Sequence, residues 1–312
     1  MYNFLIRHYV PEKDLIPLSK MLTEIESIDR DGEDTSEDAL RTALTWHNYR
    51  PEQDVWVAEL NGKLAGYAVA LEQPSQNCTV YAVVHPSQRR KGLGTQLISL
   101  TLNRARAVGS KNFLVYANEH NNAANLFVKH HQFQRVGSSG VMKAPITIEI
   151  PSYEFPEGFT LKRYSEVNEP RILLDALNVC YLDMWGHQHN DKRSEEELRS
   201  PRFLKYYSAE DILLLFNGQD SVVGICSVKS EARKAEDSNS ADLLDAPGII
   251  KEYREQGYQL QLVLAAIQHL RRKGIRPITL EFWGDGEQAL NIYRGLGFEM
   301  AHHYLAYRRE LE

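Results

Sequence analysis

The chain has 312 residues, of which 43% are hydrophobic and 25% are charged, a composition typical of soluble globular proteins. Its length predicts two domains at roughly 100–200 residues each. The formal net charge of −6 argues against a nucleic-acid or anionic-membrane partner, because binding many phosphates needs a basic field. Three widely spaced cysteines, at positions 78, 180 and 226, argue against a disulfide framework or a metal site. The N-terminus lacks an apolar signal core, so we expect a cytoplasmic protein.

The first half alternates strand-like and helix-like patterns. In chain order they predict a strand at 4–8, helices at 12–28 and 36–46, strands at 55–60, 64–72 and 79–84, a helix after residue 94, a strand at 113–117, a helix at 121–131 and a strand from 133. Asn61-Gly62, between two apolar runs, is typical of a β-hairpin. This mixture predicts an α+β fold.

The second half repeats the first. Each of the residues Arg89, Gly92, Ala124 and Phe133 has an identical counterpart 165 positions later, namely Arg254, Gly257, Ala289 and Phe298. Earlier matches, such as Asn61-Gly62 with Asn217-Gly218, have an offset of 156, so the second copy carries an insertion that includes the polar segment 230–240. We therefore predict an internal duplication, with domains at 1–145 and 158–312 joined by a proline-punctuated linker at 146–157.

The segment from Arg89 to Thr95 is the strongest candidate site. A β-rich run ends just before it, and an amphipathic helix begins just after its glycines. The free N–H groups of a helix N-terminus attract anions, and Gly92 and Gly94 leave room for a phosphate to approach the backbone. Arg89, Arg90 and Lys91 would add positive charge. The alternative interpretation is a tight turn with solvated basic residues.

Together with Asn121, Ala124, Phe127 and Phe133 further on, this loop resembles that of the GNAT family of acyl-CoA-dependent N-acetyltransferases. The resemblance implies that each half is a mixed, mostly antiparallel twisted sheet flanked by helices. It also implies that acetyl-CoA, or a related acyl-CoA, lies in a gap beside a bulged strand. The residues that would bind it are Ala82, Val83, Val84, Arg89, Arg90, Lys91, Gly92, Leu93, Gly94, Thr95, Asn121 and Ala124.

The two halves depart from the family pattern in different ways. In the first half, Val128 stands where the family has a tyrosine that protonates the leaving thiolate. In the second half, Gln259 replaces the second glycine of the loop, where its side chain can take the place of the pyrophosphate, and Gly286 replaces the asparagine. Tyr293 stands at the tyrosine position of the second half. It is a candidate general acid, with ordinary packing on the sheet as the alternative.

The resemblance extends to tandem GNAT proteins of the mycothiol-synthase type, and it implies an enzyme that acetylates a primary amine of a small molecule or a protein. The alternatives are a non-catalytic acyl-CoA-binding or sensing module, and one catalytic half with a structural second half. A homodimer is compatible with either. Each candidate general base has a solvated carboxylate or packed residue as its alternative: Glu26, Glu72, Tyr81, Glu119, Asp242, Asp245 and Glu281.

Overall fold

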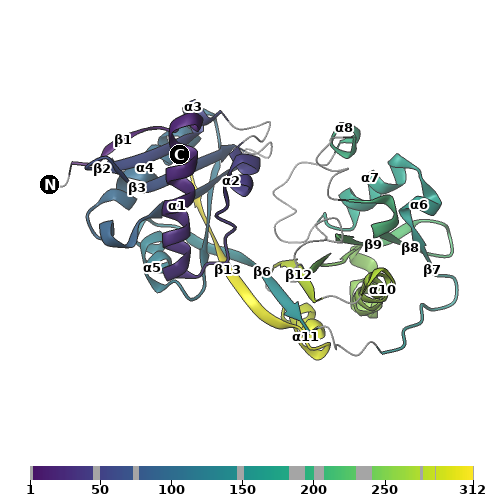
Figure 1. The fold of residues 1–312 in the computed structure, drawn as a ribbon. Helices are drawn as coiled ribbons and strands as arrows, with labels where there is room; N and C mark the ends of the chain where they lie inside the picture. The colour runs from purple at the N-terminus through teal and green to yellow at the C-terminus, as the bar shows by residue number, and fades with distance from the viewer. Residues whose placement is uncertain are drawn as a thin grey trace. The chain divides into compact units, whose positions relative to one another are not determined.

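The computed structural model describes residues 3–44, 50–72, 77–145, 151–182, 194–199, 207–229, 241–274, 277–284 and 286–311 (Figure 1). They form two compact units, and these do not follow the order of the chain. The first unit combines Met1–Val136 with Tyr304–Glu312, and the second is Gly137–His303. The boundaries at 145 and 158 describe the sequence repeat and stay a prediction.

The first unit is a sheet in the order β1-β2-β3-β4-β5-β13, antiparallel except for the parallel pair β4 and β5. The strands are β1 (Leu5–His8), β2 (Val55–Leu60), β3 (Lys63–Glu72), β4 (Asn77–Val84), β5 (Asn112–Asn118) and β13 (Glu299–Glu310). The helices are α1 (Pro11–Asp29), α2 (Glu37–Leu44), α3 (Pro51–Asp54), α4 (Leu93–Ala107) and α5 (Asn122–His130). The predicted elements of this half are thus present, with ends that differ by a few residues.

Helices cover both faces of this sheet, as Figure 1 shows for α1. On one face, Leu18, Leu22 and Ile25 of α1 pack on Val57 and Val69. On the other face, α4 and α5 bury a second apolar cluster that includes Leu97, Leu102, Phe113 and Val128. Each such buried side chain contributes about 1.5–3 kcal/mol through the hydrophobic effect. The alternation of strand side chains between faces therefore leaves two separate cores.

The second unit repeats this plan in the order β6-β12-β10-β9-β8-β7, with β11 also paired to β9. Its strands are β6 (Gln134–Ala144), β7 (Thr160–Arg163), β8 (Ile212–Phe216), β9 (Val222–Lys229), β10 (Asp242–Asp245), β11 (Gly248–Ile249) and β12 (Ile278–Trp283). α10 (Tyr258–Lys273) and α11 (Glu287–Gly295) pack on one face, and α7 (Pro170–Val179) and α8 (Glu195–Leu198) on the other. The predicted fold, α+β with a mostly antiparallel sheet flanked by helices, is confirmed in both units.

The last strand of the chain completes the first unit. Residues Tyr304–Glu310 of β13 pair with β5 in an antiparallel ladder from Tyr304↔Asn118 to Glu310↔Asn112. Tyr307 is buried in the core there, and its hydroxyl donates a 2.8 Å hydrogen bond to Asn125 Oδ1. Conversely, β6 of the first sequence copy pairs with β12 in the second unit. The two copies have therefore exchanged their final strands.

This exchange predicts that a single change at the C-terminus destabilises the first unit. Replacing Tyr307 with Ala removes a fully buried ring, which should cost about 3–5 kcal/mol in free energy of unfolding. Replacing the neighbouring, partly exposed Arg308 with Ala should cost less than about 1 kcal/mol. Urea unfolding of the two variants measures both values, and equal effects would contradict the assigned strand pairing.

Candidate acyl-CoA site and transfer centre

The loop predicted from the sequence has an open anion-binding geometry in the first unit. Gly92 has a φ of 83° and forms the N-cap of α4 without a side-chain cap. A Cβ placed on Gly92 would meet no atom within 4 Å, so the space in front of the helix N-terminus is free. The first N–H groups of α4 point toward this space, where the helix dipole is positive.

Two basic side chains of this loop form hydrogen bonds within the protein. The Arg89 guanidinium forms two hydrogen bonds with Asp29 at the end of α1, and its Nε donates to Val84 O at 3.0 Å. Lys91 Nζ donates to Ser87 O at 2.9 Å. The charge of Arg89 is thus matched by a carboxylate, and this residue fastens the loop to the end of β4. Arg90 is exposed, with a φ of 62°.

The strands before and after the loop diverge. β4 pairs with β5 from Asn77↔Asn112 to Val80↔Val115, and beyond Val80 it pairs with β3 alone. The segment with Ala82, Val83 and Val84 therefore lies beside a gap in the sheet, as the resemblance implies. The expected bulge is absent from the first unit, since β4 keeps an unshifted register with β3 from Cys78 to Val84.

The start of α5 lies next to this gap. Asn121 is its N-cap, and the side-chain Oδ1 accepts a 3.1 Å hydrogen bond from Ala124 N. Asn125 Nδ2 donates to the carbonyl oxygen of Asn118, the last residue of β5, at 2.8 Å. These bonds fix the helix to the strand end. Val128, at the tyrosine position, is 7% exposed and has no group that can donate a proton.

The second unit keeps the same loop geometry although its second glycine is missing. Arg254 Nε donates to Ile249 O at 2.8 Å, as Arg89 does to Val84 O in the first unit. Gly257 has a φ of 85° and forms the N-cap of α10, and here too a Cβ would meet no atom within 4 Å. The helix N-terminus is therefore equally open in both units.

Gln259 does not occupy the space in front of this helix. Its Nε2 donates a 2.9 Å hydrogen bond to the hydroxyl of Tyr293, which is 1% exposed. The side chain expected to displace a pyrophosphate instead points at the candidate acid. Burial raises the pKa of Tyr293 well above its usual value, so the hydroxyl keeps its proton at neutral pH. Among the described residues, no acceptor takes that proton.

The bulge missing from the first unit is present in the second. Leu244 pairs with Val228 and Gly248 with Ile225, so four steps along the β10–β11 strand match three along β9. The extra residue falls at positions 245–247, and Pro247 has no N–H to donate to a neighbouring strand. The last bond toward β12 is Ala246 N to Glu281 O at 2.8 Å. Beyond it, the strands part.

The candidate bases are distributed unevenly. Asp245 and Glu281 are Cα partners at the parting of β10 and β12, and Asp245 Oδ2 accepts a 3.0 Å hydrogen bond from Tyr207. Asp242 is 2% exposed, and Glu26 accepts backbone hydrogen bonds from residues 31 and 32. The side chain of Glu72 lies outside the described residues. The contacts of Asp245 with Tyr207 and Lys229 have no signal in the sequence, because all three residues come from separate segments.

An acidic group lies near the loop of the first unit. Burial raises the pKa of Asp31 to about 6, helped by Asp29 and Glu26 and opposed by a hydrogen bond from Asn121 and by Arg89. Burial raises the pKa of Tyr81 too, and Glu33, Asp31, Glu26 and Asp29 add to that effect. Both groups therefore hold their protons to a higher pH than they would in the unfolded chain.

Replacing Asp31 with Asn should stabilise the protein at neutral pH. The folded state holds this proton more tightly than the unfolded state, so stability falls as pH rises through the interval up to about 6. Asn carries no charge, so the variant does not lose stability as the pH rises. The variant should melt above wild type at about pH 7.5 and equally at about pH 4 in thermal unfolding. A gain of the same size at both pH values would contradict the assigned cause.

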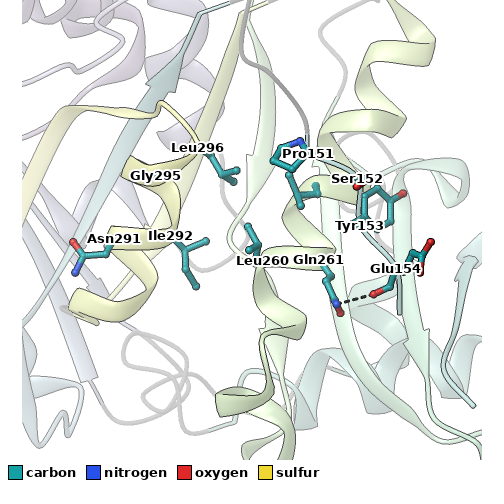
Figure 2. A pocket seen from close by; sticks show the side chains of 11 residues that line it. Pro151, Ser152, Tyr153, Glu154, Leu260, Gln261, Asn291, Ile292, Gly295 and Leu296 are labelled. Atoms are coloured by element: carbon teal, nitrogen blue, oxygen red, sulfur yellow. Dashed lines mark hydrogen bonds between the residues drawn. The ribbon is translucent and has the colours of Figure 1, made fainter. Parts of the chain in front are cut away.

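A recess of about 480 Å³ lies elsewhere in the second unit, between the segment 151–154, α10 and α11 (Figure 2). Gln261 Nε2 donates to Glu154 O at 2.7 Å across one side of it, drawn as the dashed line in Figure 2. Its walls are mostly apolar. It lies on the face of the sheet covered by α10, whereas Asp245 and Glu281 carry their side chains on the other face.

Within the described residues, no helix combines the length and apolar character needed to cross a membrane. The same residues contain no cluster of three or more His, Cys, Asp or Glu side chains suited to a metal ion.

Comparison with known proteins decides the family. The model of the acetyltransferase (GNAT) family matches residues 19–133 and again 172–298. The chain belongs to the GNAT family of acetyltransferases. The duplication predicted from the sequence and the predicted class of enzyme, an N-acetyltransferase, are thereby confirmed.

Curated relatives match about three quarters of the chain. Mycothiol acetyltransferase from Saccharopolyspora erythraea is 22% identical over 254 residues, covering 78% of this chain and 80% of the relative. The enzyme of the same name from Rhodococcus erythropolis is 26% identical over 235 residues, covering 73% and 75%.

Among solved structures, a GCN5-related N-acetyltransferase from Sphaerobacter thermophilus has a TM-score of 0.77 at 21% identity, covering 98% of this chain and 95% of the other. A tandem GNAT protein from the clavulanic acid biosynthesis pathway has a TM-score of 0.68 at 14% identity, covering 99% and 98%. These similarities show that the tandem GNAT fold is shared.

Proposed function

We propose that this protein transfers an acetyl group from acetyl-CoA to a primary amine of a small molecule, and that the transfer takes place in the second unit. The relatives named mycothiol acetyltransferase support a small-molecule acceptor. The first unit, in this proposal, binds acyl-CoA without a side-chain acid. Binding would involve the loop Arg89–Thr95 and the strand segment 82–84, with Asn121 and Ala124 beside it.

One observation carries the choice of unit. Only the second unit, within the described residues, joins an open loop to both a bulged strand and a buried tyrosine at the acid position. The first unit has a regular strand and Val128 at those places. Gln259 Nε2 donates a hydrogen bond to the Tyr293 oxygen, which leaves the hydroxyl free to donate its own proton. Because no described residue accepts that proton, it is available to a leaving group.

The chemistry then needs three things from the chain. The helix N-terminus at Gly257 offers backbone N–H groups to the phosphates of the donor. Backbone N–H groups at the bulge would stabilise the negative charge that develops on the carbonyl oxygen. Tyr293 would give its proton to the thiolate as the carbon–sulfur bond breaks, and regain one from solvent. Acetyl-CoA supplies the activated acyl group, and holding it beside the amine provides much of the rate enhancement.

The alternative is an acyl-CoA-binding module without turnover. Release of the CoA thiol, measured with spermidine, glucosamine, kanamycin and a mycothiol-type amine as acceptors, distinguishes the two. We expect acceptor-dependent release that follows saturation kinetics, with formation of the acetylated amine. Tight acetyl-CoA binding without release for any acceptor, at any concentration of enzyme, would support the sensing module instead.

A further inference from the structure

One face of the second sheet carries a group of polar side chains where β10 and β12 part. Lys229 of β9 pairs with Leu243, and Asp245 lies two residues further along β10. Because strand side chains alternate, Lys229, Asp245 and Glu281 share one face, opposite to the core residues Leu244 and Leu280. This is the face on which α7 and α8 pack.

Tyr207, Asp245 and Lys229 interact with one another. Tyr207 donates a 3.0 Å hydrogen bond to Asp245 Oδ2, while Lys229 Nζ lies 3.6 Å from Asp245 Oδ1. The Lys229 ammonium also lies 4.8 Å from the centre of the Tyr207 ring, a cation–π distance. Burial lowers the pKa of Lys229, but Asp245, Tyr207 and Glu281 outweigh this and raise it, so the lysine stays charged. Its charge balances that of Asp245.

Glu281 is the fourth residue of this group and takes no part in these interactions. Within the part of the chain that the structure describes, its carboxylate has neither a hydrogen bond nor an ion pair, although it stands beside Asp245 at the parting of the strands. With Glu281 ionised, the group carries one excess negative charge at the place where the sheet opens. Burial raises the pKa of Glu281, partly offset by Lys229 and reinforced by Asp245. Such a carboxylate takes up a proton at higher pH than an ordinary glutamate.

The acid and this carboxylate lie on opposite faces of the sheet. Tyr293 belongs to the core under α10 and α11, whereas Glu281 faces the side of α7 and α8. An acyl group held in the gap between the strands would have a proton donor on one side and a proton acceptor on the other. With the base and the acid on opposite sides of the acyl group, one can take the proton of the attacking amine while the other protonates the leaving thiolate.

The first unit lacks both carboxylates. The offset of 165 residues makes Tyr116 the counterpart of Glu281, and the extra residue of the bulge makes Tyr81 the counterpart of Asp245. Burial raises the pKa of Tyr116 to about 12, so its hydroxyl stays protonated at neutral pH and cannot accept a proton. At these two positions the first unit therefore has no carboxylate to accept a proton from an amine, and with Val128 it lacks the tyrosine of the acid position as well.

We propose that Glu281 is the catalytic base and cation-recognition residue for the acceptor amine, positioned by Asp245, Lys229 and Tyr207. This rests on the proposed transfer in the second unit. The acceptor is then a primary amine that arrives as an ammonium ion, which matches the excess negative charge. Glu281 removes one proton, and the nitrogen lone pair forms the new bond to the carbonyl carbon. The carbon–sulfur bond breaks with its electron pair on sulfur, which takes a proton from Tyr293, and the second amine proton leaves to solvent.

Glu281→Gln, compared with wild type across pH, tests this assignment. The acceptor is spermidine or glucosamine, whichever wild type acetylates faster. At about pH 7 we expect kcat/KM for the amine to fall about 10²-fold, because only the rare unprotonated amine can react. The deficit should shrink as the pH rises toward the pKa of the amine, since solution then supplies the free base. Glu299→Gln, at an exposed carboxylate on β13, is the matched control and should behave as wild type.

Two results separate this inference from the proposed function. If wild type acetylates amines and Glu281→Gln retains full activity, or loses it equally at every pH, Glu281 is not the base. If wild type acetylates no amine, or if Gly257→Glu stays fully active, the transfer in the second unit is itself wrong. Calorimetric binding of acetyl-CoA to Glu281→Gln should match wild type, and lost binding would assign Glu281 a structural role instead.

Discussion

Replacing Tyr293 with Phe should lower kcat about 10²-fold while acetyl-CoA still binds, since general acid catalysis by one positioned group contributes about 10² or more. The ring fills the same volume, so the core under α10 and α11 stays packed. The loss falls on kcat because the hydroxyl acts on a leaving group that carries charge only as the bond breaks. Steady-state kinetics with a saturating amine, and calorimetric titration of acetyl-CoA, measure the two quantities.

The variant also has a structural consequence that must be separated from catalysis. Without the hydroxyl, Gln259 Nε2 loses its acceptor, which should cost about 1–3 kcal/mol in free energy of unfolding. Tyr307→Phe is a matched control, because Tyr307 is equally buried and its hydroxyl also holds an amide side chain, that of Asn125. We expect similar destabilisation from both and loss of turnover from Tyr293→Phe alone. Equal turnover in the two variants would make Tyr293 a packing residue.

The sequence predicts the local features of this protein well. The hairpin at Asn61-Gly62, the helices after the two glycine loops and the duplication all depend on short-range patterns or on direct repetition. The glycine loop at Gly92 is of the same kind, because its positive φ and the helix that follows it are set by a few adjacent residues. Such features need no knowledge of distant contacts.

Features that join distant residues leave no local pattern in the sequence. Arg89 and Asp29 are 60 residues apart, and neither segment has a sequence pattern that predicts their ion pair. The exchange of final strands is similar, because 299–310 has the pattern of an ordinary strand whatever strand it pairs with. The direction of the Gln259 side chain depends on a tyrosine 34 residues away. In each case a specific tertiary contact overrides the local expectation.

The bulge of the second unit is an intermediate case, because a signal is present. Pro247 interrupts a strand-like run, and proline inside a sheet is confined to edges and bulges. That residue marks the place where β10 and β12 part, and hence where Asp245 and Glu281 meet the gap. The polar residues that surround them, Lys229 and Tyr207, come from other strands and loops and could be placed only by the fold.

Gly257→Glu should abolish turnover, and Gly92→Glu should leave it intact. Both glycines have a positive φ, 85° and 83°, and both have open space where a side chain would begin. The backbone strain of an L-residue, about 1–2 kcal/mol, is therefore the same at the two positions. A carboxylate about 4 Å from a phosphate charge repels it by about 4 kcal/mol near a protein surface, enough to weaken binding about 10³-fold. Any difference between the two variants thus reports which loop holds the reacting donor.

Calorimetric titration of acetyl-CoA, paired with a turnover assay, measures both effects. Wild type should bind two molecules of acetyl-CoA, and each variant should lose one of them. Gly257→Ala and Gly92→Ala carry the strain without the charge, so each should bind acetyl-CoA far better than the glutamate variant at the same position. Gly257→Ala should also turn over far better than Gly257→Glu. If Gly92→Glu instead stops turnover while Gly257→Glu does not, the transfer occurs in the first unit. Water would then have to protonate the thiolate there, because Val128 cannot.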